Sequence, residues 1–156
     1  MKALTAADVA AEQALPTLVV HVTPRTVIMG ASASRDWQPQ HHDHAWAVAK
    51  VGPKGIFLNT PNQAGWIERY LTEWAGPTAR LGKLRFRMRR PVCPGDDLIF
   101  AGRVTHAGDD GWVDVEVLLT VDDEVVTKCT ARLALPTDAN DNPWSRTGDD
   151  WRPTWT

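Results

Sequence analysis

The second half of the chain alternates between apolar and polar residues with the period of a β-strand. Leu84, Phe86 and Met88 stand between arginines, so the two kinds of side chain fall on opposite faces of an extended segment. Three further strand-like segments follow, separated by short turn sequences: residues 97–106, 112–121 and 124–135. Connections this short join neighbouring antiparallel strands. The pattern therefore predicts four consecutive antiparallel strands.

One long amphipathic helix is predicted before these strands, over residues 61–74. Its apolar residues form one stripe at helical period: Ala64, Ile67, Leu71 and Trp74. Pro61 suits the first turn of a helix, and Gly76 followed by proline ends it. A helix with one apolar face needs a sheet to cover that face. We therefore expect a single α+β domain in which a curled antiparallel sheet wraps around a central helix, the hotdog arrangement; a helix-containing β-roll of another topology is the alternative.

The first third of the chain has a less regular pattern. Residues 3–14 are predicted to form a short helix. β-branched residues then predict a strand over residues 17–23, which is expected to resume over residues 26–29 after an intervening proline. A second short helix is expected over residues 43–51, with Asp43 as its N-cap.

Composition and charge fit one globular domain followed by a polar segment. The 156 residues are 43% hydrophobic, and the formal net charge of −2 gives no general attraction to nucleic acid or to an anionic membrane. We divide the chain into an N-terminal segment (1–15), the α+β domain (16–136) and a tryptophan-containing polar tail (137–156), which is expected to be extended. No apolar run is long enough to span a bilayer. Cys93 and Cys129 form no CxxC pair, so we expect reduced cysteines in a cytoplasmic protein.

Candidate chemistry is concentrated in one loop, residues 36–44. This loop holds three of the five histidines and two aspartates around Pro39. Asp36 and His41 lie on either side of this proline, which favours a stiff loop over a helix. A carboxylate and an imidazole that converge on one water molecule can move protons to and from a substrate. From the local residues alone, an acid–base pair, a metal site and a solvated polar connection all remain open.

A metal site in this loop would take its ligands from His41, His42, Asp43 and His44. Imidazole and carboxylate groups are good metal ligands. Four consecutive side chains rarely converge on one ion, however, and the rest of the sequence supplies no second clear pair of ligands. We therefore predict no metal and assign structural roles to the last three of these residues.

The loop sequence Asp36-Trp37-Gln38-Pro39-Gln40-His41 resembles the Asp-x-Asn-Pro-x-His signature of the MaoC-like (R)-specific enoyl-CoA hydratases, which are hotdog proteins. Other segments resemble the small hydratase subunits of actinobacterial steroid side-chain degradation: Ile56-Phe57-Leu58-Asn59, Arg69-Tyr70 and Trp74-Ala75-Gly76-Pro77. The resemblance covers about residues 16–135. Two positions depart from the pattern, because Gln38 replaces the usual asparagine and Asn59 stands where many relatives have a glycine.

The resemblance implies an enzyme of lipid metabolism that adds water across the 2,3 double bond of an acyl-CoA thioester, with a steroid side-chain enoyl-CoA as a candidate substrate. In the family, the residues that match Asp36 and His41 act jointly as acid and base. The backbone N–H groups of Asn59 and Thr60, at the start of the central helix, are candidate donors to the enolate oxygen. The equal alternative is that Asn59 simply caps the helix. No cofactor is expected, since coenzyme A is part of the substrate.

One dense basic patch is a candidate site for the phosphates of coenzyme A: Arg85, Arg87, Arg89 and Arg90. A row of arginines on one strand is more commonly the solvated side of a sheet. The patch is therefore a weaker candidate than the acid–base pair.

Two other functions stay open at this point. A hotdog thioesterase would use a carboxylate on the central helix, for which Glu68 is available, but it would leave Asp36 and His41 unexplained. Alternatively, the chain is one subunit of a heteromeric MaoC-like hydratase, in which it contributes the catalytic half-site or only shapes the acyl pocket of its partner. Hotdog chains commonly pair, so we expect a homodimer or a complex with a second hotdog hydratase chain, and no nucleic-acid or membrane partner.

Overall fold

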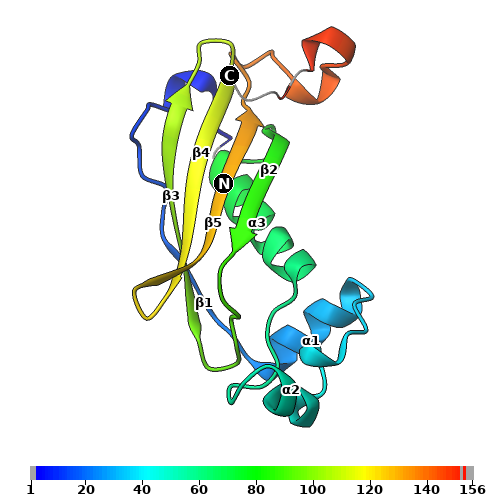
Figure 1. Ribbon diagram of the computed structural model, residues 1–156. Helices are drawn as coiled ribbons and strands as arrows, with labels where there is room; N and C mark the ends of the chain where they lie inside the picture. The colour runs from blue at the N-terminus through cyan, green and yellow to red at the C-terminus, as the bar shows by residue number, and fades with distance from the viewer. Residues whose placement is uncertain (1–2, 152, 154–156) are drawn as a thin grey trace.

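The computed structural model describes residues 3–151 and 153. Its five strands form one antiparallel sheet in the order β1-β3-β4-β5-β2, which curls around helix α3, Thr60–Ala75 (Figure 1). The strands are β1 Leu18–His21, β2 Arg80–Met88, β3 Asp97–Ala107, β4 Trp112–Val121 and β5 Glu124–Ala134. The predicted α+β domain with a curled sheet around a central helix is confirmed.

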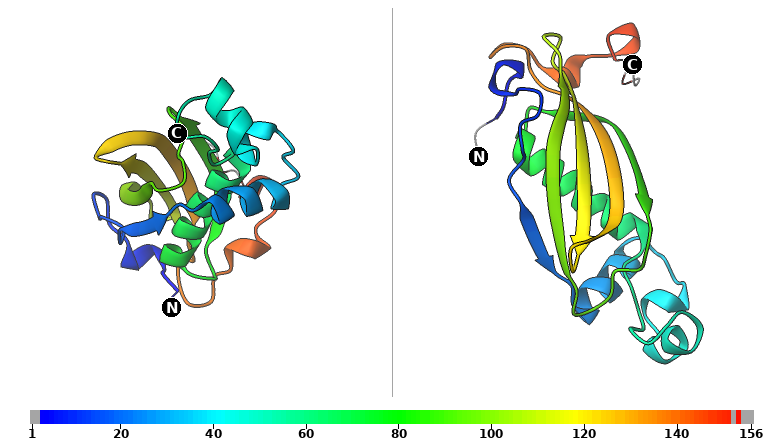
Figure 2. Two further views of the ribbon diagram at one scale, coloured as in Figure 1. Left: turned by 90° about the horizontal axis from the view of Figure 1, so that it is seen from below. Right: turned by 60° about the vertical axis from the view of Figure 1, so that its left-hand side comes forward.

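The core lies between α3 and the face of the sheet that the helix covers (Figure 2). Along β4, every second side chain is buried and the others are half-buried. The buried members of this strand are Val113, Val115, Val117, Leu119 and Val121. The four later strands were predicted from this alternation, and β3, β4 and β5 agree with the predicted bounds to within one residue.

Helix α3 is confirmed and extends one residue beyond the predicted range at each end. Ile67 and Leu71 of the predicted stripe are fully buried, whereas Ala64 and Trp74 are half-buried at its margin. The helix ends at Gly76, whose φ of +88° lies in the region that favours glycine.

The strand predicted over residues 26–29 is wrong, because these residues belong to helix α1, Pro24–Ala33. Thr23 is the N-cap of this helix, and its Oγ1 accepts a hydrogen bond from the backbone N–H of Thr26 at 3.1 Å. Pro24 occupies the first helical turn, where its fixed φ is favourable and its missing N–H costs nothing. This start signal outweighs the β propensity of the residues that follow it.

The helix predicted over residues 3–14 is also wrong, since only a 3₁₀ turn, Ala6–Asp8, forms there. The rest of the segment runs beside β3, where the backbone N–H of Glu12 donates to the carbonyl of Val104 at 2.9 Å. The backbone N–H of Leu15 donates to the carbonyl of Gly102 at the same distance, 2.9 Å. The free edge of the sheet therefore outcompetes the helical propensity of an alanine-rich sequence.

The predicted short helix after the loop is confirmed as α2, His44–Lys50. Asp43 caps it as expected, because its Oδ1 accepts a hydrogen bond from the backbone N–H of Trp46 at 2.9 Å. Together, α1 and α2 extend beyond the sheet at the end where α3 begins (Figure 1).

Cys93 and Cys129 are free and buried, as expected for reduced structural cysteines. Burial raises the pKa of the Cys129 thiol to about 12, so this thiol is un-ionised at neutral pH. None of the described helices is long and apolar enough to cross a lipid bilayer.

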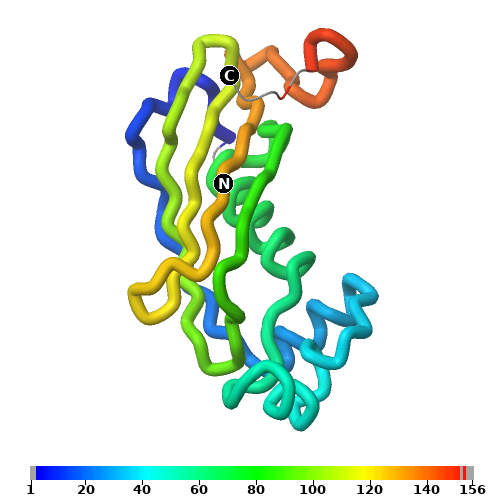
Figure 3. Tube along the Cα trace, viewed as in Figure 1, coloured from blue at the N-terminus to red at the C-terminus, as the bar shows by residue number. Residues whose placement is uncertain are grey.

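The described part of the polar tail, residues 137–151 and 153, folds back on the sheet where an extended segment was expected, and residues 152 and 154–156 lie outside the described residues. It contains two 3₁₀ turns, Pro143–Ser145 and Gly148–Asp150, and lies beside the start of β2 (Figure 3). The ring of Trp151 packs on that of Trp112 with centroids 5.1 Å apart. The guanidinium carbon of Arg80 lies 3.6 Å from the centroid of the Trp151 ring. Aromatic and cation–π contacts of this kind explain why Trp151 stands in a polar segment.

We expect Trp151→Ala to lower the free energy of unfolding by about 1–2 kcal/mol, the sum of one aromatic pair and one cation–π contact. The control is Trp144→Ala, because this ring is 59% exposed and its centroid is 5.6 Å from the guanidinium carbon of Arg80. The control should cost less than about 0.5 kcal/mol. Urea denaturation followed by circular dichroism measures both, and equal losses would contradict the anchoring role of Trp151.

Candidate active site

The predicted pair, Asp36 and His41, comes together where α1, the loop and the start of α3 meet. His41 lies in a single 3₁₀ turn, Pro39–His41, that begins at the predicted stiffening proline. Its Nε2 is 3.5 Å from Oδ2 of Asp36. The side chain of His41 is 6% exposed and that of Asp36 is 23% exposed. The pair therefore combines a buried imidazole with a carboxylate that a ligand can reach.

Phe57, in the segment that leads into α3, fixes the orientation of His41. Its Nδ1 lies 2.8 Å from the carbonyl oxygen of Phe57, and the two rings meet edge to face with centroids 4.8 Å apart. A carbonyl only accepts hydrogen bonds, so Nδ1 carries the proton in the neutral ring and Nε2 is the acceptor. Nε2 thus faces a carboxylate oxygen, a second acceptor. Two acceptors at this separation are suited to share one water molecule that donates to both.

The end of α1 aims Asp36 at this position. Arg35 has a positive φ of +55°, and the backbone N–H of Asp36 donates to the carbonyl of Ala31 at 2.9 Å. The backbone N–H of Arg35 donates to the carbonyl of Ser32 at 3.1 Å. These two bonds form a Schellman motif, which reverses the chain sharply at a helix end. A non-glycine residue occupies the left-handed position directly before the candidate catalytic carboxylate.

Hydrogen bonds reach both oxygens of the Asp36 carboxylate. Oδ2 accepts from Nδ2 of Asn59 at 3.0 Å, and Oδ1 accepts from the backbone N–H of Gln38 at 3.3 Å. The bond from Asn59 is the main reason that the pKa of the Asp36 carboxyl lies below its usual value, with smaller contributions from Gln38 and the two nearby histidines, and with burial acting in the opposite direction. Asp36 is therefore ionised at neutral pH.

Asn59 caps α3, which confirms one of the two roles predicted for this residue. Its Oδ1 accepts a hydrogen bond from the backbone N–H of Asn62 at 3.1 Å. Within residues 3–151 and 153, the backbone N–H groups of Asn59 and Thr60 donate to no protein acceptor. Capping by the side chain therefore leaves both backbone donors free at the positive end of the helix dipole, and their role as oxyanion donors stays a prediction.

Helix α1 is held on the first turn of α3 by close packing. Nδ2 of Asn62 donates to the carbonyl of Thr26 at 3.2 Å. A Cβ atom at Gly30 would lie 2.0 Å from this same Nδ2, so a larger residue here would have to displace the Asn62 side chain. Nδ2 of Asn59 also donates to Oγ of Ser34, the residue that caps the end of α1, at 2.8 Å. Sequence reasoning missed α1 and these contacts, although the Thr-Pro pair at its start was a usable signal.

The remaining residues of the loop have separate roles. His42 is exposed, and Asp43 is used as the cap of α2. His44 packs beside Gly55, where an added Cβ would lie 2.3 Å from its ring. The described part of the chain contains no group of three or more His, Cys, Asp and Glu side chains placed to hold a metal ion.

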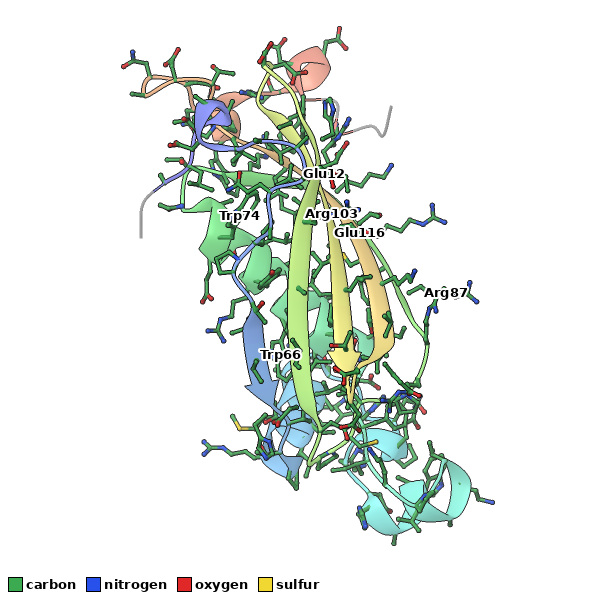
Figure 4. All side chains as sticks on the ribbon, turned by 90° about the vertical axis from the view of Figure 1, so that its left-hand side faces the viewer. Glu12, Trp66, Trp74, Arg87, Arg103 and Glu116 are labelled. Atoms are coloured by element: carbon green, nitrogen blue, oxygen red, sulfur yellow. The ribbon has the colours of Figure 1, made fainter. Side chains whose placement is uncertain are left out.

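The arginine patch divides into two parts. Arg85 and Arg87 are exposed on the face of β2 opposite to Phe86, which packs against the core. Figure 4 shows Arg87 on the side of the sheet away from Trp66 and Trp74 of α3. Arg89 is exposed as well. The outward-facing arginines therefore lie across the sheet from α3, whose first turn forms part of the candidate site.

Arg90 differs from the three exposed arginines because it is tied to the β4–β5 hairpin. It is half-buried, and its guanidinium donates to the carbonyl of Val121 at 3.1 Å and pairs with Glu124 at 3.2 Å. Its positive charge is thus partly neutralised by Glu124 and is less available to a ligand.

Comparison with known families gives a match to one domain model over most of the chain. The model described as "MaoC like domain" matches residues 6–127. Among curated proteins, the 3-oxo-4,17-pregnadiene-20-carboxyl-CoA hydratase beta subunit of Mycobacterium tuberculosis is 39% identical over 104 residues, which are 67% of this chain and 79% of that protein.

Solved structures give matching folds. A chain of the ChsH1–ChsH2 complex of Mycobacterium tuberculosis is 32% identical, with a TM-score of 0.77 over 81% of this chain and 98% of that chain. The R-hydratase PhaJ1 of Pseudomonas aeruginosa is 20% identical, with a TM-score of 0.78 over 86% of each chain. The second likeness concerns the fold alone, and the predicted hotdog fold is confirmed.

The docking of α1 can be tested with two glycines that both lie inside helices. We expect Gly30→Ala to lower the free energy of unfolding by about 1–3 kcal/mol, because the new methyl group overpacks the contact with Asn62. Gly65→Ala is the control, since a Cβ there meets nothing within 4 Å. The control should stabilise the protein by about 0.5–1 kcal/mol through helix propensity. A Gly30→Ala variant as stable as the wild type in urea denaturation would show that the crossing is not close-packed.

Proposed function

The chain belongs to the MaoC-like domain family, and on this premise we propose that it hydrates the 2,3 double bond of an enoyl-CoA thioester, with Asp36 and His41 as its acid–base pair. The observation that carries the proposal is the 3.5 Å separation between Nε2 of His41 and Oδ2 of Asp36. The carbonyl of Phe57 fixes the tautomer of His41, so that two acceptors face one another. A water molecule that donates to both has its oxygen lone pairs free to attack carbon.

The reaction then needs only proton transfers and one new carbon–oxygen bond. The water oxygen bonds to C3 of the substrate while one of its protons passes to the pair, and the π electrons move toward the thioester oxygen as an enolate. The enolate returns its electrons to C2, which takes a proton from the pair. The pair ends with the protons it had at the start, and a positioned acid–base pair of this kind accelerates a reaction by about 10²–10⁴-fold.

The enolate oxygen requires hydrogen-bond donors where its charge develops. The backbone N–H groups of Asn59 and Thr60 are proposed for this role, since they lie at the positive end of the α3 dipole next to Asp36. Donors held by a helix need no rearrangement during the reaction, which is the condition under which they stabilise a transition state most.

The relatives suggest the substrate class and the partner. One relative is named as the beta subunit of a hydratase that acts on a steroid carboxyl-CoA, and one solved structure is a complex of two different chains. We propose a steroid side-chain enoyl-CoA as substrate and a second hotdog hydratase chain as partner, with a homodimer as the alternative. The reaction needs no cofactor, and the two free cysteines fit a cytoplasmic location.

We propose that the arginine patch, Arg85, Arg87, Arg89 and Arg90, binds the phosphates of coenzyme A. The charges of Arg85, Arg87 and Arg89 support it. Their position on the outer face requires the nucleotide to pass over the edge strand β2. Arg90 contributes less, because it already pairs with Glu124.

We expect Asp36→Asn and His41→Ala each to lower the hydration rate by about 10²–10⁴-fold, because each removes one partner of the proton transfers. The assay follows the loss of conjugated thioester absorbance with short-chain and steroidal 2-enoyl-CoA substrates. His42→Ala is the control, since this neighbouring imidazole is exposed. Near-wild-type rates in both Asp36→Asn and His41→Ala would reject the assignment.

Other outcomes of the same assay identify the alternatives. Release of free coenzyme A thiol would favour a thioesterase, for which Glu68 is exposed on α3. Activity that appears only after addition of a second hotdog chain would show a heteromeric enzyme. Activity lost to a chelator and restored by a metal ion would overturn the prediction that the site works without metal.

A further inference from the structure

The side chain of Asn59 contacts the candidate catalytic carboxylate, the end of α1 that carries it and the first turn of α3. Its Nδ2 donates to Oδ2 of Asp36 at 3.0 Å and to Oγ of Ser34 at 2.8 Å. Its Oδ1 accepts from the backbone N–H of Asn62 at 3.1 Å. We infer that Asn59 is a positioning residue, which holds the Asp36 carboxylate against His41 through its side-chain amide. The inference rests on the proposed function and is separate from the role of the Asn59 backbone N–H.

The orientation of this amide is determined by its partners. The backbone N–H of Asn62 can only donate, so the atom that faces it must be the oxygen of Asn59. The nitrogen then has two hydrogens for two acceptors, Ser34 and Asp36. The residue is 1% exposed, so water does not compete for these bonds. A rotation of the amide would break the cap of α3 and both bonds to the end of α1 at once.

Asn59 acts on the carboxylate oxygen that matters for the pair. Oδ2, which accepts from Asn59, is also the oxygen that lies 3.5 Å from Nε2 of His41. Oδ1 is held by the backbone N–H of Gln38. Rotation about the last bond of an aspartate side chain is otherwise only weakly restricted. The two donors therefore fix the plane of the carboxylate and direct one oxygen toward the imidazole.

Ser34 extends the same connection into α1. Its Oγ accepts from Asn59 and donates to the carbonyl of Gly30 at 2.8 Å, inside the last turn of the helix. Asn59 thus joins the first turn of α3 to the last turn of α1, directly before the reversal at Arg35 that presents Asp36. The amide positions both the carboxylate and the helix end that carries it.

The ionisation of Asp36 gives a readout that a purely structural role would not affect. The donor from Asn59 favours the charged carboxylate and lowers its pKa. His41 and His42 are the titratable groups whose charges also act on Asp36 in this direction, and burial acts against them. Removing only the donor should therefore raise the pKa of Asp36 while the two histidines stay in place.

The test uses Asn59→Ser, which separates the two functions of the amide. Serine is a good N-cap, so α3 stays capped, but its shorter side chain cannot reach Asp36. We expect the carboxyl ¹³C resonance of Asp36 to titrate at higher pH in the variant than in the wild type. The acid limb of the profile of kcat/KM against pH should move in the same direction, and kcat should fall about tenfold with a smaller change in KM.

A second variant and a matched control accompany it. Asn59→Asp keeps the cap oxygen and replaces the donor with a second acceptor, so the pKa of Asp36 should rise further. Asn62→Ser is the control, because this asparagine of the same helical turn contacts the carbonyl of Thr26 on α1. The control should leave the titration of Asp36 and the pH profile unchanged.

The outcomes separate this inference from the proposed function. An unchanged titration of Asp36 in folded Asn59→Ser and Asn59→Asp would overturn the positioning role, even if hydration were observed. An equal shift in Asn62→Ser would also overturn it, because helix packing would then be the cause. A titration shift in the variants would support the contact even if the wild-type chain, alone and with a second hotdog chain, hydrated no enoyl-CoA, a result that would reject the proposed function.

Discussion

The contact between the last turn of α1 and the first turn of α3 is the interaction on which the candidate site depends. The buried side chains of Ile67 and Leu71 hold α3 in the core. The first turn of α3 is thereby fixed, and the residues of the candidate site are positioned against it. Asn59, the N-cap of this turn, donates a hydrogen bond to Asp36. The carbonyl of Phe57, three residues before the helix begins, is hydrogen-bonded to His41. Both halves of the pair are thus positioned from one helix end.

The chemistry of the pair follows from which atoms are already bonded. Nδ1 of His41 is bonded to the carbonyl of Phe57, so Nε2 is the ring nitrogen that can accept from a water molecule. Oδ2 of Asp36 accepts from Asn59, but a carboxylate oxygen can accept a second hydrogen bond, and this oxygen is the one that faces Nε2. Two facing acceptors repel unless a donor lies between them, and the donor from Asn59 offsets part of that cost by stabilising the charge of Asp36. The site is organised before substrate arrives, which is the property that lowers a barrier most effectively.

Local patterns were sufficient for the elements that depend on local physics. Strand alternation predicted the later strands, the apolar stripe predicted α3, and Asp43 was recognised as a cap. The strand expected at residues 26–29 is wrong, because the Thr-Pro start signal of α1 outweighs the β propensity of these residues. The contacts of Trp151 with Arg80 and of Asn59 with Asp36 join residues far apart in the chain. The pattern of apolar and polar residues along the chain carries no information on such long-range contacts. The packing of the tail and the role of the Asn59 amide therefore become visible only in the structure.

Two positions close to Asp36 lower the stability of the fold locally. This observation supports a functional role for the region without reference to any related protein. Gly30 stands inside a helix, where glycine costs about 0.5–1 kcal/mol relative to alanine. A Cβ at this position would collide with the side chain of Asn62 on α3. Arg35 adopts a left-handed conformation that costs an L-residue about 1–2 kcal/mol. Both exceptions lie within six residues of Asp36 and serve to place it. The reversal at Arg35 and the close crossing at Gly30 together determine where the Asp36 carboxylate lies, and local costs of this kind are expected where a side chain must be placed accurately.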